Sequence, residues 1–579
     1  MNAYHRLWAG LIIVIIGSFA VLGWSGYEIY MKAPPIPTAV VAAGQQPLYT
    51  GEQIQNGQNV WQSMGGQQVG SIWGHGAYVA PDWSADYLHR EAVALLDLWA
   101  LRDHGVAFDA LTLERQAALQ ARLTSEMRAN TYDPSTGTVT VSADRATVIQ
   151  GLAAYYDGLF GDAAADTQLR SDYAMAANVV PDAARRAELG AFFFWAAWAC
   201  STNRPDAAIT YTNNWPHEPL IGNQPTSSLI LWTGVSLVLL LIGIAALASY
   251  FAVQKRRTQE EPEVPQTDPL QALTPTPSMR ATLKYFWVVA ALMLVQILMG
   301  VLTAHYGVEG TGFYGIPIAE WLPYSITRTW HTQLAIFWIA TAWLATGLFI
   351  APAVGGHEPP YQAVGVNFLF VCLLIIVVGS FAGEWMGVQQ KLGNLQNFWF
   401  GHQGYEYVDL GRFWQIFLLI GLFLWLALVA RALWPAFSRP AESRGLLALF
   451  VVSATAIAGF YGAGLMWGQH TNLAIAEYWR WWVVHLWVEG FFEVFATVVI
   501  AFLFARLGLL EPKSTERAVV VSSTIFLTGG IVGTLHHLYY SGTPSIVAAM
   551  GSVFSALEVV PLVFIGYEAW DNFRLSRHR

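Results

Sequence analysis

Charged side chains are scarce in this chain of 579 residues, where Asp, Glu, Lys and Arg together make up only 12%. A soluble globular protein carries about 25%, so this composition excludes an ordinary water-soluble domain. Cysteine is also scarce, since only Cys200 and Cys372 are present. Two cysteines exclude a disulfide framework and a thiolate metal site, and no C-x-x-C-H sequence is present for covalent attachment of a c-type haem.

Long apolar segments take the place of the missing charge. Hydrophobic residues make up 55% of the chain, and tryptophan occurs 26 times. Because about 20 apolar residues cross a bilayer as a helix, the sequence predicts a polytopic α-helical membrane protein with ten spans. The spans lie near 9–29, 227–252, 285–304, 325–352, 362–383, 412–433, 444–467, 479–505, 518–540 and 545–568.

Basic residues outside the spans set the predicted orientation. They gather after the second span, between the sixth and seventh, between the eighth and ninth, and after the tenth. These residues are Lys255, Arg256, Arg257, Arg431, Arg439, Arg444, Lys513, Arg517, Arg574, Arg577 and Arg579. All lie on one side if the N-terminus is cytoplasmic, as the positive-inside rule expects.

The same pattern divides the chain into five parts. Residues 1–30 form a membrane anchor, expected to be retained because the segment is long and has no clear signal-peptide cleavage site. Residues 31–226 form a polar external domain, and 227–253 a second anchor helix. Residues 254–281 form a Pro-rich cytoplasmic linker, and 282–579 a bundle of about eight spans.

Two neighbouring histidines, His536 and His537, lie in the apolar segment TIFLTGGIVGTLHHLYYSG. Imidazoles are costly in a membrane and usually mark a functional site there. A second apolar segment, WWVVHLWVEGFFEVF, carries His485 and Glu489 one helical turn apart. Span eight enters from outside and span nine leaves there, so two helices can place all four side chains around one ion. Imidazoles with a hard carboxylate suit iron or another first-row metal better than copper(I).

Each of these residues also has a purely structural interpretation. Adjacent histidines point about 100° apart on a helix, so one could face solvent or a carbonyl group. Glu489 could pair with a basic group, although no Lys or Arg lies at its depth in these spans. Glu558 is an isolated acid in FSALEVVPLVF, either a protonated, hydrogen-bonded group or a proton relay, which needs that same state. His331 opens the outer end of span four, three residues after Arg328, and fits an axial haem ligand with a propionate partner.

The spacing of the three histidines resembles that of the non-haem metal ligands in the haem–copper oxidase superfamily. Oxygen-reducing members carry a tyrosine one turn after the first histidine, and the Glu489 found here resembles the nitric oxide reductases instead. The segments GSIWGHGAYVAPDW (70–83) and TAHYGVEGTGFYG (303–315) resemble the quinol-dependent subgroup. The resemblance implies a catalytic-subunit-like helix bundle with a fused external cytochrome-c-like domain that lacks haem c.

The resemblance also implies roles for individual residues. His485, Glu489, His536 and His537 would hold the non-haem iron, and His331 would be an axial ligand of a low-spin haem b. Glu489 and Glu558 would be the catalytic carboxylates, with Glu558 helping to deliver protons. The remaining assignments are His305, Glu309 and Phe313 for the quinol pocket, and the Gly76 carbonyl, Tyr78 and Glu406 for a calcium ion that bridges the haem propionates.

The implied reaction is 2 NO + 2 e⁻ + 2 H⁺ → N₂O + H₂O, at a binuclear centre of high-spin haem b3 and iron in the bacterial inner membrane. The implied partners are quinol, nitric oxide and the lipid bilayer, with no nucleic acid, and either a homodimer or a separate C-terminal piece. The family carries an H-x-H pair of haem ligands on a later span, and this chain has no H-x-H. We therefore expect a truncated or split enzyme that is inactive alone.

Three alternatives stay open at this stage. The first is a quinol-oxidising oxygen reductase of the same superfamily, which copper at the second metal site would reveal. The second is a metal or proton transporter or a membrane sensor, which an absence of haem absorbance would favour. The third is a non-catalytic remnant of a disrupted gene.

Overall fold

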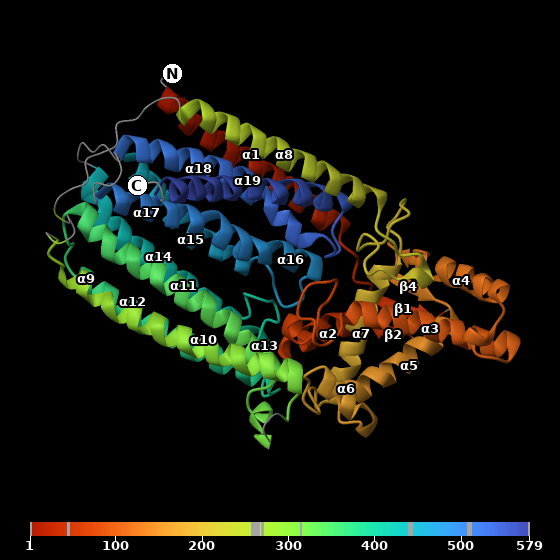
Figure 1. Ribbon diagram of the computed structural model, residues 1–579. Helices are drawn as coiled ribbons and strands as arrows, with labels where there is room; N and C mark the ends of the chain where they lie inside the picture. The colour runs from red at the N-terminus through yellow and green to blue at the C-terminus, as the bar shows by residue number, and fades with distance from the viewer. Residues whose placement is uncertain are drawn as a thin grey trace.

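The computed structural model describes residues 3–42, 47–255, 267, 271, 273–312, 315–437, 444–506 and 512–576. Phe313, expected in the quinol pocket, and most of the predicted linker 254–281 lie outside the described residues. The described chain forms a long helical bundle with a second, mixed domain at one end (Figure 1).

The bundle consists of apolar helices that correspond to the predicted spans. Helices are expected here because a spanning segment must satisfy its backbone groups internally. Their bounds are α1 Ala3–Lys32, α8 Ser227–Lys255, α10 Leu283–Glu309, α11 Tyr324–Gly355, α12 Gln362–Val388, α14 Arg412–Phe437, α15 Arg444–Tyr461, α16 Leu473–Trp481, α17 Glu493–Arg506, α18 Pro512–Gly533 and α19 Ser545–Ser576.

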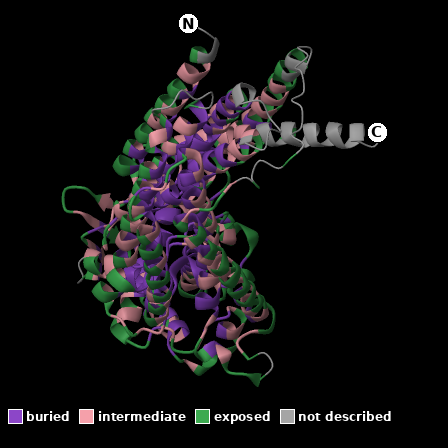
Figure 2. Cartoon of the chain, turned by 90° about the vertical axis from the view of Figure 1, so that its left-hand side faces the viewer, coloured by how far each residue is buried: buried purple, intermediate pink, exposed green. Residues whose placement is uncertain are grey.

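Within the described part of the chain, nine helices are long and apolar enough to cross a membrane, and they match the first nine predicted spans. The tenth predicted span, 545–568, lies in α19, whose described apolar part is Ser545–Val560. Its crossing of the membrane stays a prediction. Figure 2 shows buried residues along the centre of the molecule and exposed ones at its edges. The exposed positions of the bundle include large apolar side chains such as Leu294, Val378 and Trp434, as a lipid-facing surface requires.

Short elements connect the spans, and four of those described are not α-helical, namely one π-helix and three 3-10 helices. The π-helix η9 Trp482–Phe492 joins α16 to α17, and the 3-10 helix η10 Thr534–Leu538 follows α18. The other connecting elements are α9 Pro277–Ala281, η7 Ile318–Glu320, α13 Asn394–Phe400 and η8 Gly462–Leu465.

The external domain is built mainly of helices around a small sheet. Its helices are α2 Gly51–Ser63, η1 Gly66–Gln68, α3 Trp83–His104, η2 Phe108–Ala110, α4 Leu113–Arg128, α5 Ala143–Phe160, η3 Ala164–Asp166, α6 Thr167–Asp172, α7 Ala183–Ser201 and η4 Pro219–Ile221. The strands are β1 Ala39–Ala42, β2 Pro47–Thr50, β3 Tyr132–Asp133 and β4 Thr138–Val141, in the order β2-β1-β4-β3. Strands β1 and β4 are parallel, with Val40 opposite Val139, and the other two pairs are antiparallel.

Helix α7 forms the centre of the external domain because its sequence AFFFWAAWAC is apolar on every face. A helix of this kind must be covered on all sides, and Phe192 to Cys200 are all buried. The Phe193 ring stacks on Trp83 of α3 with centroids 5.5 Å apart. Cys200 and Cys372 are both buried and free.

The two anchor helices run along the bundle. Helix α1 packs against α18, and α8 packs against α19 (Figure 1). The chain enters the external domain from α1 and leaves it into α8. These two helices contact α18 and α19, which lie directly before and after the segment with the histidine pair.

Candidate metal centre and its surroundings

The structure brings the four predicted metal ligands together at the outer end of the bundle. The Nε2 atoms of His536 and His537 are 2.7 Å apart, and His537 Nε2 is 3.3 Å from His485 Nδ1. The Glu489 carboxylate lies 2.9 Å from the same His485 nitrogen. Ligand atoms that share an ion at about 2.0–2.2 Å are themselves roughly 3 Å apart, so the three imidazoles match a common coordination site. Glu489 falls in a second group of possible ligand atoms, with His485 and Glu558, rather than in the group of the three histidines.

The contacts of His485 fix which of its nitrogens faces the cluster. Its Nε2 lies 2.8 Å from the Gly530 carbonyl oxygen, which can only accept a hydrogen bond. The proton is therefore on Nε2, and the Nδ1 lone pair points at Glu489 and His537. A second bond that sets the tautomer in this way is typical of metal-ligating histidines.

The donor atoms of the cluster can be compared with those that a metal ion requires. The nitrogens of the three histidines lie close together, and a Glu489 oxygen lies beside His485. Acceptor atoms this close repel unless protons or a cation lie between them. The ring of His537 is held by parallel stacking on Trp481, with centroids 3.6 Å apart. The donor set and its rigid support fit a first-row metal ion with mixed nitrogen and oxygen ligands.

The backbone that carries these side chains is not α-helical, and the sequence pattern did not predict this conformation. His485 and Glu489 lie in the π-helix η9, and the histidine pair in the 3-10 helix η10. Both segments were predicted as α-helical, and that part of the prediction is wrong. Wider and tighter turns rotate side chains relative to an α-helix, and π segments are frequent at functional sites.

Glu558 of α19 lies beside the cluster, and two glycines of α18 leave room for its side chain. One of its carboxylate oxygens lies 3.6 Å from His485 Nε2 and is buried without a hydrogen-bond partner. A Cβ atom on Gly533 of α18 would be 1.9 Å from that oxygen, and one on Gly529 would be 2.9 Å from the Glu558 Cγ atom. The two glycines leave the groove in which the Glu558 side chain lies.

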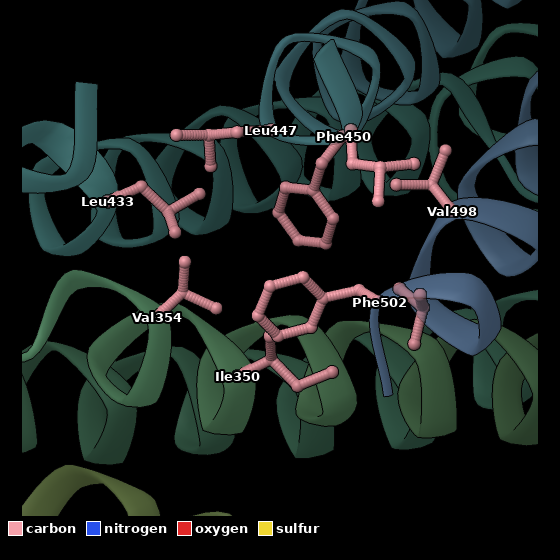
Figure 3. Close-up of a pocket in the computed structure, with 9 residues that line it drawn as sticks. Ile350, Val354, Leu433, Leu447, Phe450, Val498 and Phe502 are labelled. Atoms are coloured by element: carbon pink, nitrogen blue, oxygen red, sulfur yellow. The ribbon is translucent and has the colours of Figure 1, made fainter. Parts of the chain in front are cut away.

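A cavity of about 340 Å³ adjoins the cluster between α11, α12, α14 and η9. His537 and Glu489 line it together with mostly apolar side chains, among them Ile336, Leu344 and Val484. Deeper in the bundle a cavity of about 20 Å³ has only apolar lining, from residues such as Ile350, Phe450 and Phe502 (Figure 3). This smaller cavity is a packing defect with no polar group. The cavity beside His537 and Glu489 is therefore the candidate reaction site.

The sequence patterns did not single out several charged residues around the site. Glu493 lies one turn after Glu489 and is exposed, and the i, i+4 spacing could have indicated it. Glu384 of α12 is fully buried, and neither of its carboxylate oxygens has a hydrogen-bond partner. Arg480 and Glu477 are buried and paired at 2.7 Å. No sequence pattern distinguishes these last three from ordinary interfacial residues.

His331 lies two turns into α11 rather than at its first residue, and it faces α10. Its Nδ1 is 2.8 Å from the Gln296 carbonyl oxygen, so Nδ1 carries the proton and Nε2 is the nitrogen left for a metal. A Cβ atom on Gly300 would be 2.7 Å from the His331 ring, which makes room for the imidazole between the two helices. His331 is not among the residues that line the cavity beside His537.

The predicted quinol residues lie near the outer end of α10. His305 Nδ1 and a Glu309 carboxylate oxygen are 3.2 Å apart, and both side chains are partly exposed at 31% and 42%. The structure therefore places an acid and an imidazole together on an accessible surface.

The predicted calcium residues lie in two loops where the external domain meets the bundle. The Tyr78 hydroxyl donates to the Gly74 carbonyl at 2.5 Å and is exposed, and Gly76 has a positive φ of 135°. The Glu406 carboxylate pairs with Arg328 at 2.7 Å. No described contact joins Glu406 to Gly76 or Tyr78, so a shared calcium ion stays a prediction.

A buried polar network surrounds Glu406. Its backbone carbonyl accepts from Arg480 at 2.9 Å, and its backbone N–H donates to Gln67 of the external domain at 2.9 Å. Asp409 in the same loop accepts from Gln68 at 3.1 Å and from Gln333 at 3.2 Å, and burial raises the pKa of its carboxyl group well above the ordinary value. The network joins the external domain to the bundle within two turns of the metal cluster.

Comparison with known proteins supports the same assignment. Residues 37–217 match the model of the cytochrome c-like domain of the nitric oxide reductase B subunit. Residues 280–574, just over half of the chain, match the model of cytochrome c and quinol oxidase polypeptide I. The B subunit of nitric oxide reductase from Stutzerimonas stutzeri is 24% identical over 286 residues, which cover 49% of this chain and 57% of that protein.

These matches cover both parts of the molecule, and the chain spans somewhat over half the length of the relative that it matches. The second match ends in α19 and includes every residue of the histidine and carboxylate cluster. The chain thus belongs to the haem–copper oxidase family, in the branch of the nitric oxide reductase B subunits.

Proposed function

We propose that this chain is the catalytic part of a quinol-dependent nitric oxide reductase, which reduces two NO molecules to N₂O and water. Family membership implies haem and iron as cofactors. The observation that carries the proposal is the cluster of three histidines between η9 and η10, with neighbouring ring nitrogens 2.7 and 3.3 Å apart and the Glu489 carboxylate 2.9 Å from His485. The full activity is proposed for the complete protein, because the match covers 57% of the relative.

The donor set favours iron over copper at the non-haem position. Copper(I) prefers soft ligands, whereas a carboxylate is a hard ligand. Here Glu489 and the three histidines would hold the iron, and His331 would hold a low-spin haem b through its Nε2. When bound, the iron and the haems, including haem b3, would supply the electrons and the Lewis acidity for reduction.

The residues around the centre have supporting roles in this proposal. Gly530 orients His485, and Trp481 orients His537, so the ligands need not rearrange on binding. The mostly apolar cavity admits small uncharged gas molecules and holds two of them close together, as a coupling reaction requires. Glu558 and Glu489 can each hold or release a proton at a carboxylate oxygen beside the cavity or the cluster.

Quinol oxidation is assigned to the outer end of α10. His305 and Glu309 form a pair able to accept the two protons that quinol releases, and Phe313 is the proposed ring contact. In this arrangement the protein lies in the inner membrane with residues 31–226 in the periplasm, and Gly76, Tyr78 and Glu406 would hold a calcium ion at the interface.

Metal analysis of the purified full chain tests the proposal. We expect iron in excess of haem, no stoichiometric copper, and N₂O formation from NO with a quinol donor when the complete protein is isolated. Changing Glu489 to Ala should lower the iron content. Loss of a residue that only hydrogen-bonds to a metal ligand lowers metal affinity by about 10–100-fold, and loss of a ligand itself should cost at least as much. Changing the exposed Glu114 of α4 to Gln is the matched control. Copper in place of iron, or iron retained in the Glu489 variant, would contradict the proposal.

A further inference from the structure

The turn that follows the histidine pair is bound by side chains of the external domain. Residues 539–544 connect η10 to α19, and His537 is only two residues before Tyr539. Segment 204–215 of the external domain, which follows α7, contacts this turn. We refer to segment 204–215 as the clamp loop.

Arg204 of the clamp loop binds only backbone carbonyls. Its guanidinium donates to Thr543 at 2.6 Å, to Thr210 at 3.1 Å and to Lys32 at 3.2 Å, and it also donates to Tyr211. These carbonyls belong to three separate segments, the end of α1, the clamp loop and the turn. A planar group with five donors thus fixes all three segments relative to one another.

Asn213 makes the second attachment. Its side-chain amide donates to the Tyr539 carbonyl at 3.0 Å and to the Thr543 carbonyl at 3.1 Å, and the residue is 7% exposed. Its backbone has a positive φ of 55°, a conformation that asparagine tolerates better than most residues. One amide group therefore joins the first residue of the turn to its fifth.

The turn is also held by packing. The Trp215 ring stacks on Tyr540 with centroids 5.1 Å apart and an interplanar angle of 23°. Gly542 has a φ of 72°, and a Cβ atom there would be 2.8 Å from Pro34 and 3.2 Å from Trp73. The Thr543 hydroxyl donates back to the Leu538 carbonyl at the end of η10 at 2.6 Å. The path from the clamp loop to the histidine segment is therefore continuous.

We propose that the clamp loop positions His536 and His537, with Arg204 and Asn213 as positioning residues of the metal centre. The inference rests on the proposed function only in assigning the metal as iron. Ligands must be held to within about 0.5 Å for a productive site, and the hydrogen bonds of a 3-10 helix such as η10 have poorer geometry than those of an α-helix. The external domain, which has no C-x-x-C-H motif, thus acts as a structural support for the membrane site.

Release of the metal to a chelator tests the role of the clamp loop. The full chain is purified with its metal, reduced, and mixed with an iron(II) chelator, and the release rate is compared among variants. We expect Asn213→Ala and Asn213→Asp to release iron about 10–100-fold faster than wild type, the range for loss of a group that orients a ligand. The aspartate keeps the shape but removes the donors, and Arg204→Lys should show an intermediate rate.

Asn178 provides a matched control. It is an exposed asparagine of the same domain with a φ of 55°, so Asn178→Ala carries the same backbone strain without touching the turn. The inference is supported if only the Asn213 and Arg204 variants lose iron faster while haem content and unfolding temperature match the Asn178 variant. Equal release rates, or metal loss with a parallel loss of haem and stability, would overturn it. Wild type that holds copper overturns the proposed function, while faster copper release from the Asn213 variants still supports the clamp.

Discussion

At the residue scale, two buried residues of loop 401–411, His402 and Asp409, show how burial decides protonation. His402 is fully buried, its Nδ1 accepts from the Gly404 backbone N–H at 2.9 Å, and its Nε2 donates to the Thr329 hydroxyl at 2.8 Å. Both nitrogens are used by a neutral ring, and burial lowers the pKa of His402 to about 3. Asp409 nearby has one carboxylate oxygen with no hydrogen-bond partner. The loop therefore holds His402 in its uncharged form, and it joins the external domain to the bundle through the hydrogen bond from Gln68 to Asp409.

The lowered pKa of His402 predicts a dependence of stability on pH. The ordinary pKa is 6.5 and that of the folded state is about 3, so the unfolded chain takes up a proton first as pH falls. The free energy of unfolding should then fall between pH 6.5 and 3, by at most about 1.4 kcal/mol per pH unit from this group. The apparent unfolding temperature in detergent, measured at pH 7 and pH 5, checks this.

The variant His402→Gln isolates the contribution of the histidine. The amide does not titrate, so the drop between pH 7 and pH 5 should become smaller than in wild type, even though the variant is less stable at pH 7. An unchanged drop would mean that groups other than His402 control the dependence. Because the pKa of Asp409 is raised, its ionisation destabilises the fold as pH rises, which is the opposite sign.

At the scale of elements, the site depends on short segments that depart from the α-helix and on glycines that allow close packing. The π-helix η9 and the 3-10 helix η10 carry the ligands. Helix α19 approaches η10 so closely that a Cβ atom on Gly551 would be 2.7 Å from the His536 backbone nitrogen. The same helix places Glu558 against Gly529 and Gly533 of α18. Glycines thus allow the close helix packing that places His536 and Glu558.

Adding one methyl group to α18 should disturb the carboxylate. In Gly533→Ala the new Cβ would lie 1.9 Å from the Glu558 oxygen, so the carboxylate must move away from His485. We expect loss of about 1–3 kcal/mol of stability from overpacking and a fall in NO reduction of roughly tenfold or more, since a proton-transfer group contributes about 10²–10⁴-fold. Unfolding temperature and N₂O production measure the two effects.

Gly459→Ala is the control for this change. Gly459 lies in another bundle helix, α15, and nothing is within 4 Å of a Cβ atom built there. The variant should keep its activity and stability. Wild-type activity in Gly533→Ala would show that the position of Glu558 relative to His485 is unimportant.

At the scale of the whole molecule, the external domain and the bundle act as one unit. Arg185 of α7 donates to Gln390 at 2.6 Å and to Ser63 and Asn394 at 3.1 Å each. Together with the clamp loop and the network around Glu406, this gives the external domain several separate attachments to the end of the bundle beside which it lies in Figure 1. A domain held in this way can transmit its position to the metal ligands.

Removing the Arg185 attachment should weaken the whole protein. We expect Arg185→Ala to lower the free energy of unfolding by about 1–3 kcal/mol, because hydrogen bonds to a charged group are lost at a partly buried position. The exposed Arg115 of α4, changed to Ala, should leave stability unchanged. Thermal unfolding in detergent compares the two, and equal stabilities would show that this contact contributes little.

The predicted orientation can be tested by cysteine labelling, because both native cysteines are buried. A membrane-impermeant maleimide added to intact spheroplasts should label Arg115→Cys in the external domain. It should label Thr274→Cys, within the predicted cytoplasmic linker, only after the membrane is opened. The reverse pattern would contradict the positive-inside assignment.

The sequence by itself determined the membrane class, nine of the spans and the candidate metal ligands. It could do so because bilayer thickness fixes the length of an apolar run, and because intramembrane histidines and acids are rare enough to stand out. The family resemblance carried by His485, Glu489 and the 536–537 pair is confirmed by the comparisons.

Only the tertiary structure decided how these residues meet. The non-α turns of η9 and η10, the glycine groove around Glu558 and the attachment of the 539–544 turn to Arg204 and Asn213 depend on packing between segments far apart in sequence. Residue periodicity reports which face of a helix is apolar, whereas backbone distortion and close approach are set by the neighbouring segments. For that reason the chemistry of the site was predictable from the sequence, and its support by the external domain was not.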